Sequence, residues 1–292
     1  MPLPIRLRKQ WTAAHLIGAV LLMAAGAAVT LPAWIDIFRI AIRDQEASHI
    51  FLVPLIAVWL IWARRGRFRS VMPTGRWAGP LIVAVGWAMS YFGFYHAVQA
   101  AWHAGAIVVV VGCLLSVVGT DVLWRFLPAF VVMAFLVPVP GMIRQMISIP
   151  LQQHTAVVTQ AVLELVGAPV ELHGLSLTYK DVPVTIAEAC NGMRMVFALV
   201  LVSYGFAFGT PLRGYVRVLI LAASPISAIL CNVVRLIPTV WIHGNYPRQV
   251  GESFHNLSGW VMLPVAFLIL LGIIRLLRWA LIPVSPFTLA YE

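Results

Sequence analysis

Long apolar stretches, separated by short polar or charged segments, dominate the pattern of this sequence. Crossing the hydrocarbon core of a bilayer takes a helix of roughly 20 apolar residues, and most of the stretches approach that length. The sequence therefore predicts an all-α polytopic integral membrane protein with about eight transmembrane helices, organised as a single transmembrane domain over residues 1–292. The predicted spans cover residues 12–35, 49–63, 77–95, 104–119, 122–138, 188–208, 216–241 and 254–274.

Two segments between the fifth and sixth spans depart from this pattern. Residues 142–166 mix apolar positions with charged and amide side chains, which is typical of an amphipathic helix lying in the membrane interface. Residues 167–186 alternate apolar and polar positions with a period of two, and turn signals occur at His173-Gly174 and Lys180-Asp181. This second segment predicts a short β-hairpin outside the bilayer core.

Composition agrees with a membrane protein and excludes several other classes. Hydrophobic residues make up 61% of the chain and charged residues 10%, and the mean hydropathy is +0.93, whereas a soluble domain carries about 25% charged residues. The net charge of +10 does not indicate nucleic-acid binding, because the basic residues lie mainly in short loops and are not interleaved with exposed aromatics. Cys113, Cys190 and Cys231 have neither a CxxC pair nor zinc-ligand spacing, so we expect no disulfide framework, no metal and no cofactor.

The distribution of arginine predicts the orientation of the chain. If the amino terminus is cytoplasmic, most basic residues fall in cytoplasmic loops, including the dense cluster at residues 64–69. The first apolar run follows Arg6, Arg8 and Lys9 and lacks a cleavage site, so we interpret it as a retained first span. We expect both termini in the cytoplasm.

Three polar residues that are far apart in the sequence are expected at one depth, near the outer surface. Cys190 lies at the outer start of the sixth span, and His255 opens the eighth. Arg235 follows Arg217 by 18 residues, which places it about 27 Å along the seventh span. A helix amino terminus and the nearby cation of Arg194 both favour the thiolate form of a cysteine such as Cys190.

Each of these residues also has a purely structural interpretation. A cysteine in a membrane helix is more often a packing residue than a nucleophile, and Cys113 and Cys231 keep that interpretation. An arginine near a span end commonly extends its charge to the interface, although ionisable groups inside spans usually face a polar cavity. The remaining histidines have no metal-ligand spacing and fit scattered interfacial positions, with Ser48-His49 the pair to single out. The accessory or substrate-binding candidates are Glu188, Asn191, Arg194, Asn232, Ser48 and His49.

A thiol with a positioned histidine and arginine suits acyl transfer. Cys190 would attack a peptide carbonyl and form a thioester, while His255 shuttles the proton. Arg235 would stabilise the developing oxyanion or the departing group. The alternative is a transporter or channel for anionic polysaccharide or lipid-linked intermediates, lined by Arg194 and Arg235, but the sequence has no sign of inverted repeats.

Several motifs resemble the exosortase/archaeosortase family of membrane transpeptidases, and the similarity extends over about residues 30–275. They are Ala189-Cys190-Asn191-Gly192-Met193-Arg194, Asn232-Val233-Val234-Arg235, Phe254-His255-Asn256-Leu257-Ser258-Gly259, Ser48-His49 and Pro138-Val139-Pro140. The resemblance implies that Cys190 is the nucleophile, Arg235 a proton donor or polar catalyst, and His255 the third member of the site. Asn191 and Ile50 depart from residues common in the family, which leaves the recognised motif open.

The resemblance also implies partners and a location. The substrates would be membrane-anchored proteins with a carboxy-terminal sorting signal of the PEP-CTERM type, and the function would be linked to exopolysaccharide and surface-protein sorting. The enzyme would be a multi-pass protein of the bacterial inner membrane, in contact with lipid and not with nucleic acid. Its active site would face the extracytoplasmic side.

Overall fold

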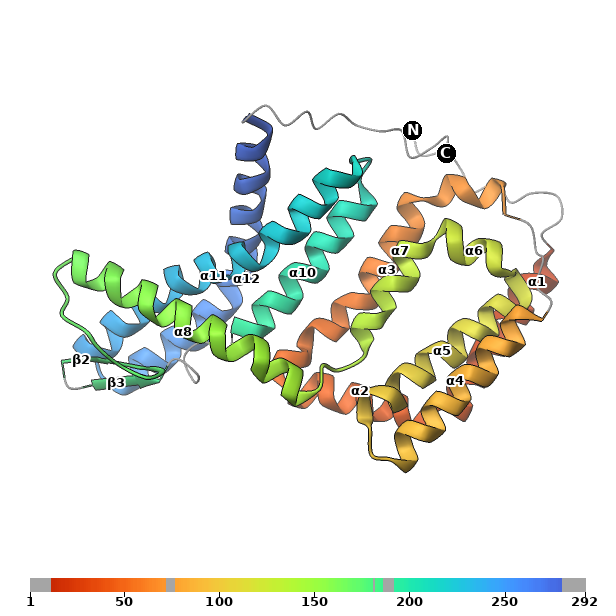
Figure 1. Cartoon of the computed structure of the whole chain (residues 1–292), viewed down its shortest axis with the longest axis horizontal. Coiled ribbons are helices and arrows are strands. Elements are labelled where there is room, and N and C mark those ends of the chain that lie inside the picture. Colours follow the sequence, from red (N-terminus) through yellow and green to blue (C-terminus); the bar gives the residue numbers. More distant parts are fainter. Residues whose placement is uncertain (1–11, 72–76, 181, 186–191, 280–292) are drawn as a thin grey trace. The chain divides into compact units, whose positions relative to one another are not determined.

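Helices and one small sheet make up the computed structural model, which describes residues 12–71, 77–180, 182–185 and 192–279 (Figure 1). The prediction of an all-α polytopic membrane protein is confirmed. Within the described residues, four helical segments are long and apolar enough to cross a membrane, and six are counted if each of two bent helix pairs is one span. The four are Glu46–Ala63, Ala78–Tyr95, Gln99–Val118 and Gly214–Asn245. A total of eight spans stays a prediction.

The chain divides into two compact units. The first extends to Pro140 and includes Tyr204–Pro211; the second comprises Gly141–Ser203 and the chain from Leu212 to Ser285. The first unit contains α1 (Ala13–Val29), α2 (Leu31–Arg43), η1 (Gln45–Phe51), α3 (Leu52–Ala63), η2 (Arg65–Arg69), α4 (Ala78–Tyr95), α5 (Gln99–Val118), α6 (Thr120–Arg125), α7 (Leu127–Val132) and η3 (Met133–Leu136). The second contains α8 (Gly141–Leu165), β1 (Glu171–His173), β2 (Ser176–Tyr179), β3 (Val182–Thr185), most of α10 (Gly192–Gly209), α11 (Gly214–Asn245) and α12 (Arg248–Trp279).

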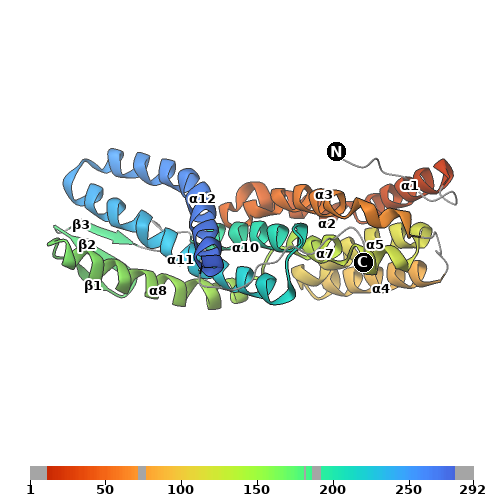
Figure 2. The ribbon, with the colours of Figure 1, turned by 90° about the horizontal axis from the view of Figure 1, so that it is seen from above.

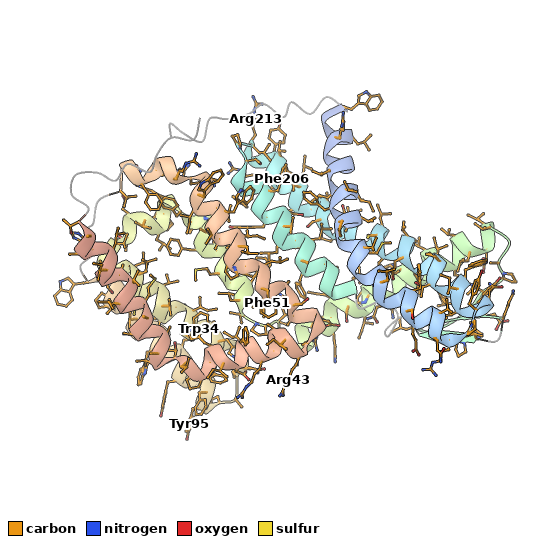
Figure 3. All side chains as sticks on the ribbon, turned by 180° about the vertical axis from the view of Figure 1, so that it is seen from behind. Trp34, Arg43, Phe51, Tyr95, Phe206 and Arg213 are labelled. Carbon is orange, nitrogen blue, oxygen red and sulfur yellow. The ribbon has the colours of Figure 1, made fainter. Side chains whose placement is uncertain are left out.

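A break at Thr30 divides the segment that was predicted to be the first span. The axes of α1 and α2 are bent by 78°, so the residues of the predicted span 12–35 belong to two helix segments, and the span itself stays a prediction. The Thr30 hydroxyl donates to the Gly26 carbonyl oxygen and accepts the indole N–H of Trp34, at 2.8 and 3.0 Å. The Trp34 side chain is labelled in Figure 3. Pro32 lies in the first turn of α2, where a missing backbone N–H costs nothing.

The predicted fifth span, residues 122–138, is also interrupted. It comprises most of α6, then α7 and η3, and the segment Leu127–Leu136 is bent by 92° against α8. Pro128 stands in the first turn of α7, directly after the break at Phe126. As at Thr30, a proline marks the start of a new helix.

Arginines of the basic cluster after α3 are bound to main-chain oxygens of the first unit. Arg64 is buried, and its Nη2 donates to the Phe208 carbonyl oxygen in the last turn of α10, at 3.1 Å. Arg67 donates to the Arg125 carbonyl oxygen at 3.0 Å. A cation at the carboxyl end of a helix satisfies carbonyls that have no partner within the helix. The cluster therefore binds carbonyl oxygens at the carboxyl ends of α6 and α10, in addition to any effect of its charge on the orientation of the chain in the membrane.

Glycines bring α4 and α5 into close contact along their length (Figure 1). Gly79, Gly86 and Gly93 recur every seven residues on α4, and Gly105 and Gly112 do the same on α5. A Cβ at Gly93 would overlap the Trp102 amide, and one at Gly86 would lie 2.7 Å from the amide nitrogen of Val109. Small residues at such an interface allow two membrane helices to approach backbone to backbone.

Replacing Gly86 by alanine is expected to destabilise the first unit by about 1–3 kcal/mol, because the added methyl forces the two backbones apart. The measurement is thermal unfolding of the purified protein in detergent. Gly18 on α1 is the matched control, since a Cβ there meets nothing within 4 Å. Alanine at that position should leave the melting temperature unchanged or raise it, because alanine is the better helix former. Equal melting temperatures for wild type and Gly86→Ala would contradict the prediction.

The second unit is layered around α11, which has α12 on one side and α8 with the sheet on the other (Figure 2). The predicted helix over residues 142–166 is confirmed as α8, and a face formed by Thr155, Ala156, Thr159 and Leu163 is buried. Its position in the membrane interface stays a prediction.

The predicted hairpin is a three-stranded antiparallel sheet in the order β1-β2-β3. Leu172 pairs with Leu177, and Leu177 pairs with Val184. The turn at Gly174 has a φ of +63°, a backbone conformation that glycine adopts without strain. Leu177 and Val184 are buried in the same cluster as Leu236 and Val240, which anchors the sheet to α11.

Candidate active site

Two of the predicted polar site residues lie in the buried part of α11. Asn232 is 2% exposed and Arg235 is 5% exposed. They are three residues apart, so their side chains leave neighbouring positions on one helix face. A charge and an amide in an apolar span are costly unless they have polar surroundings or a function.

Two contacts fix the register of α11 against α12. The Cys231 thiol donates to the Met262 carbonyl oxygen at 3.3 Å. Two turns after Arg235, the imidazole of His243 lies against Gly251, with Nε2 2.7 Å from the position a Cβ would take there. The two helices run antiparallel as a hairpin (Figure 2). Both contacts agree on the register to within one residue.

This register brings the backbones of Arg235 and His255 to the same part of the hairpin. His255 lies level with Thr239, and the buried Ser258 lies level with Arg235, each to within one residue. Arg235 and Thr239 are separated by one helical turn, about 6 Å along the axis. The side chain of His255 lies outside the described residues.

A polar contact from α8 reaches Asn232. The Nδ2 group of Asn232 is 3.5 Å from the Thr155 hydroxyl, and both residues are buried. Thr159 follows one turn later on the same face of α8 and is fully buried. Within the described part of the chain, the Asn232 Oδ1 and the Thr159 hydroxyl have no hydrogen-bond partner. Sequence reasoning missed both threonines; the signal was their spacing of four on an otherwise apolar helix face.

The segment that contains Glu188, Cys190 and Asn191 lies outside the described residues. Arg194 is in the first turn of α10, and its side chain is outside them too. The elements that precede and follow the Cys190 segment in the sequence both pack on α11. Val184 of β3 shares a buried cluster with Leu236, and Val196 of α10 shares another with Cys231. These two positions of α11 lie on opposite sides of Arg235 along the helix.

Ser48 and His49 belong to the first unit, whereas Asn232 and Arg235 belong to the second. His49 is 3% exposed, and its Nδ1 lies 3.0 Å from the Glu46 carbonyl oxygen within η1. A carbonyl oxygen only accepts, so Nδ1 is the donor. Both accessory candidates lie in η1 (Gln45–Phe51).

No group of three His, Cys, Asp or Glu side chains in the described segments is arranged to hold a metal ion. The chemistry available at the site is that of a guanidinium, an amide, hydroxyls and imidazoles. These are groups for stabilising an oxyanion and moving protons.

Comparison with known proteins identifies a family for this chain. A family model described as transmembrane exosortase matches residues 34–272. This range begins within α2 and ends within α12, and it includes Cys190, Arg235 and His255. No curated protein and no solved structure matches the chain.

Proposed function

Because the chain belongs to the transmembrane exosortase family, we propose that it is a membrane-embedded cysteine peptidase or transpeptidase with Cys190 as its nucleophile. Its substrates would be exported proteins that carry a carboxy-terminal sorting signal of the PEP-CTERM type. Sorting of these proteins would accompany exopolysaccharide production at the bacterial inner membrane, with the site on the extracytoplasmic side.

The observation that carries this proposal is the α11–α12 register. It puts the backbones of Arg235 and His255 one helical turn apart, although the two residues are 20 positions apart in the sequence. Val184 and Val196, which flank the segment that contains Cys190 in the sequence, are both buried in clusters with residues of α11.

The reaction follows from the chemistry of the three side chains. The Cys190 sulfur attacks the carbonyl carbon of the scissile peptide bond, and His255 takes the thiol proton. Arg235 stabilises the negative charge on the carbonyl oxygen, and the C–N bond breaks as the leaving nitrogen receives the proton. The thioester that remains on Cys190 is resolved by water or by an acceptor nucleophile.

Co-expression with a substrate that carries such a tail tests the proposal. The tail would have a short motif, a transmembrane helix and a basic end. We expect a smaller substrate product and a substrate–enzyme adduct that hydroxylamine releases, because hydroxylamine cleaves thioesters. Cleavage without any hydroxylamine-sensitive adduct, even when turnover is slowed by low temperature, would contradict a thioester mechanism.

A further inference from the structure

Positive charge is concentrated in the first unit directly after the carboxyl end of α3. The segments 64–70 and 120–126 contain one carboxylate, Asp121, and five arginines, at positions 64, 65, 67, 69 and 125. Nε of Arg125 donates to both oxygens of the Asp121 carboxylate, at 2.9 and 2.8 Å. Five arginines less one aspartate give the two segments together a net charge of +4.

Hydrogen bonds bring these two segments to one place in the fold. Arg67 Nη1 donates to the Arg125 carbonyl oxygen at 3.0 Å, and Arg125 Nη1 donates to the Ser70 hydroxyl at 2.8 Å. The rings of Phe68 and Phe126 pack together, with their centroids 4.5 Å apart. The end of α3 therefore lies beside α6 (Figure 1), and the arginines of both segments belong to one surface.

Neutral groups hold two of these arginines in fixed orientations. Arg65 Nη1 donates to the Trp62 carbonyl oxygen at 3.1 Å, and its guanidinium lies over the Trp62 indole, 4.4 Å from the ring centroid. A carbonyl oxygen and an indole ring have no net charge, so these contacts orient a guanidinium without neutralising it. Within the described residues, the buried Nε of Arg67 has no hydrogen-bond partner. The surface is thus preorganised to bind an anion.

An apolar stripe on α3 leads to this charge. Leu55, Val58 and Trp62 follow one another at spacings of three and four residues, so they share one helix face, and all three are exposed. The apolar segment Glu46–Ala63 is long enough to cross a membrane, and the arginines begin directly after it. Trp124 of α6 is exposed too. Exposed tryptophans at the end of a span are typical of the interface between membrane and water.

We propose that this end of the first unit is a binding site for an anionic phospholipid. The lipid phosphate accepts hydrogen bonds from Arg65 and Arg67, because a guanidinium presents a planar pair of donors that matches a phosphate. One acyl chain lies along the stripe formed by Leu55, Val58 and Trp62. The choline cation of phosphatidylcholine is repelled by the arginines, so the site selects lipids with a net negative charge. Arginines that only set the orientation of the chain would need neither fixed guanidinium groups nor the stripe beside them.

The test measures lipid binding to the full-length protein in a neutral detergent, where the arginines no longer set an orientation. Dioctanoyl phosphatidylglycerol and dioctanoyl phosphatidylcholine are titrated separately, and native mass spectra give the dissociation constant of each. We expect wild type to bind phosphatidylglycerol about 30-fold more tightly, since each of two arginines contributes about fivefold. Arg65→Gln should therefore weaken phosphatidylglycerol binding about fivefold, and Arg65→Gln/Arg67→Gln about 30-fold. Phosphatidylcholine binding should change by at most about twofold, because its headgroup has no net charge.

Arg39→Gln/Arg43→Gln is the matched control, because both arginines are exposed on α2 in the same unit and their loss changes the net charge equally. It should keep wild-type affinity for phosphatidylglycerol. Equal weakening by the two double variants would overturn the proposal, since net charge alone would then explain binding. So would equal affinity of wild type for the two lipids.

Two further measurements keep the test decisive. Arg67 also supports α6, so the melting temperature of each variant is measured. If the double variant is unfolded, Arg65→Gln carries the test, and wild-type affinity for phosphatidylglycerol in that variant overturns the proposal. Inorganic phosphate in millimolar excess should leave lipid binding unchanged. Displacement of phosphatidylglycerol by inorganic phosphate would overturn the lipid site, because the arginines would then bind the phosphate ion alone.

Discussion

Cys190→Ala is expected to abolish processing of a co-expressed substrate while the protein still inserts into the membrane. Loss of the nucleophile in an acyl-transfer enzyme lowers kcat by about 10⁶-fold, which is below detection in a processing gel. The hydroxylamine-sensitive adduct should vanish with it, because no sulfur remains to carry the acyl group. Cys190→Ser should be inactive as well, since a hydroxyl is far less acidic than a thiol and the site is set for a thiolate.

The two other cysteines provide controls in the same chain. Cys113 is buried against Gly26 of α1, and Cys231 is fully buried against Met262 of α12. Alanine at either position should keep processing, with at most a loss of stability from the lost packing. Wild-type cleavage by Cys190→Ala would mean that another protease acts on the substrate, and it would favour the transport function.

Arg235→Ala is expected to lower kcat by about 10²–10³-fold, the usual cost of removing one oxyanion-stabilising donor. Arg235→Lys should recover only part of this loss, because an ammonium keeps the charge but not the planar set of donors. The measurement is the initial rate of product formation, compared at equal amounts of folded protein. Thermal unfolding of each variant is needed, because Arg235 is buried and its truncation leaves a void in α11's packing.

Arg248 is the matched control for Arg235. It lies in the same unit, but its side chain is 89% exposed, and it forms an ion pair with Glu252, which follows it by one turn. Such exposed pairs contribute about 0–1 kcal/mol to stability, so Arg248→Ala should process substrate normally. Equal losses for both variants would indicate that the net charge of the second unit matters, and not the buried guanidinium.

The apolar runs predicted the interior of the long helices well. The span predicted over residues 77–95 is α4 at Ala78–Tyr95, and the span predicted over 216–241 lies within α11. The start of α5 was missed by five residues because the prediction followed hydropathy. Gln99 and His103 are polar, but both bond the Asp36 carboxylate of α2, at 2.9 and 3.0 Å. A tertiary partner of this kind leaves no trace in the local pattern.

For the candidate site, too, the sequence predicts positions along single helices but not the packing between helices. Counting residues along a helix could place Arg235 and His255 at similar depths, and the hairpin brings their backbones to one region. The register of α11 against α12 depends on side-chain packing at Cys231 and Gly251, which no periodicity encodes. Thr155 was overlooked because the polar residues of α8 suggested a helix facing the interface, whereas one of its faces is buried against α11.

The glycine interface of α4 and α5 has a consequence for the order in which the chain assembles. The two helices are joined by only three residues, His96, Ala97 and Val98, so bringing them together closes a very short loop. Loop-closure entropy grows with the length of the loop, and contacts between sequence neighbours form fastest. During synthesis, this helical hairpin can therefore be complete before α10 and α11 leave the ribosome, and the later helices are added to a part that is already formed.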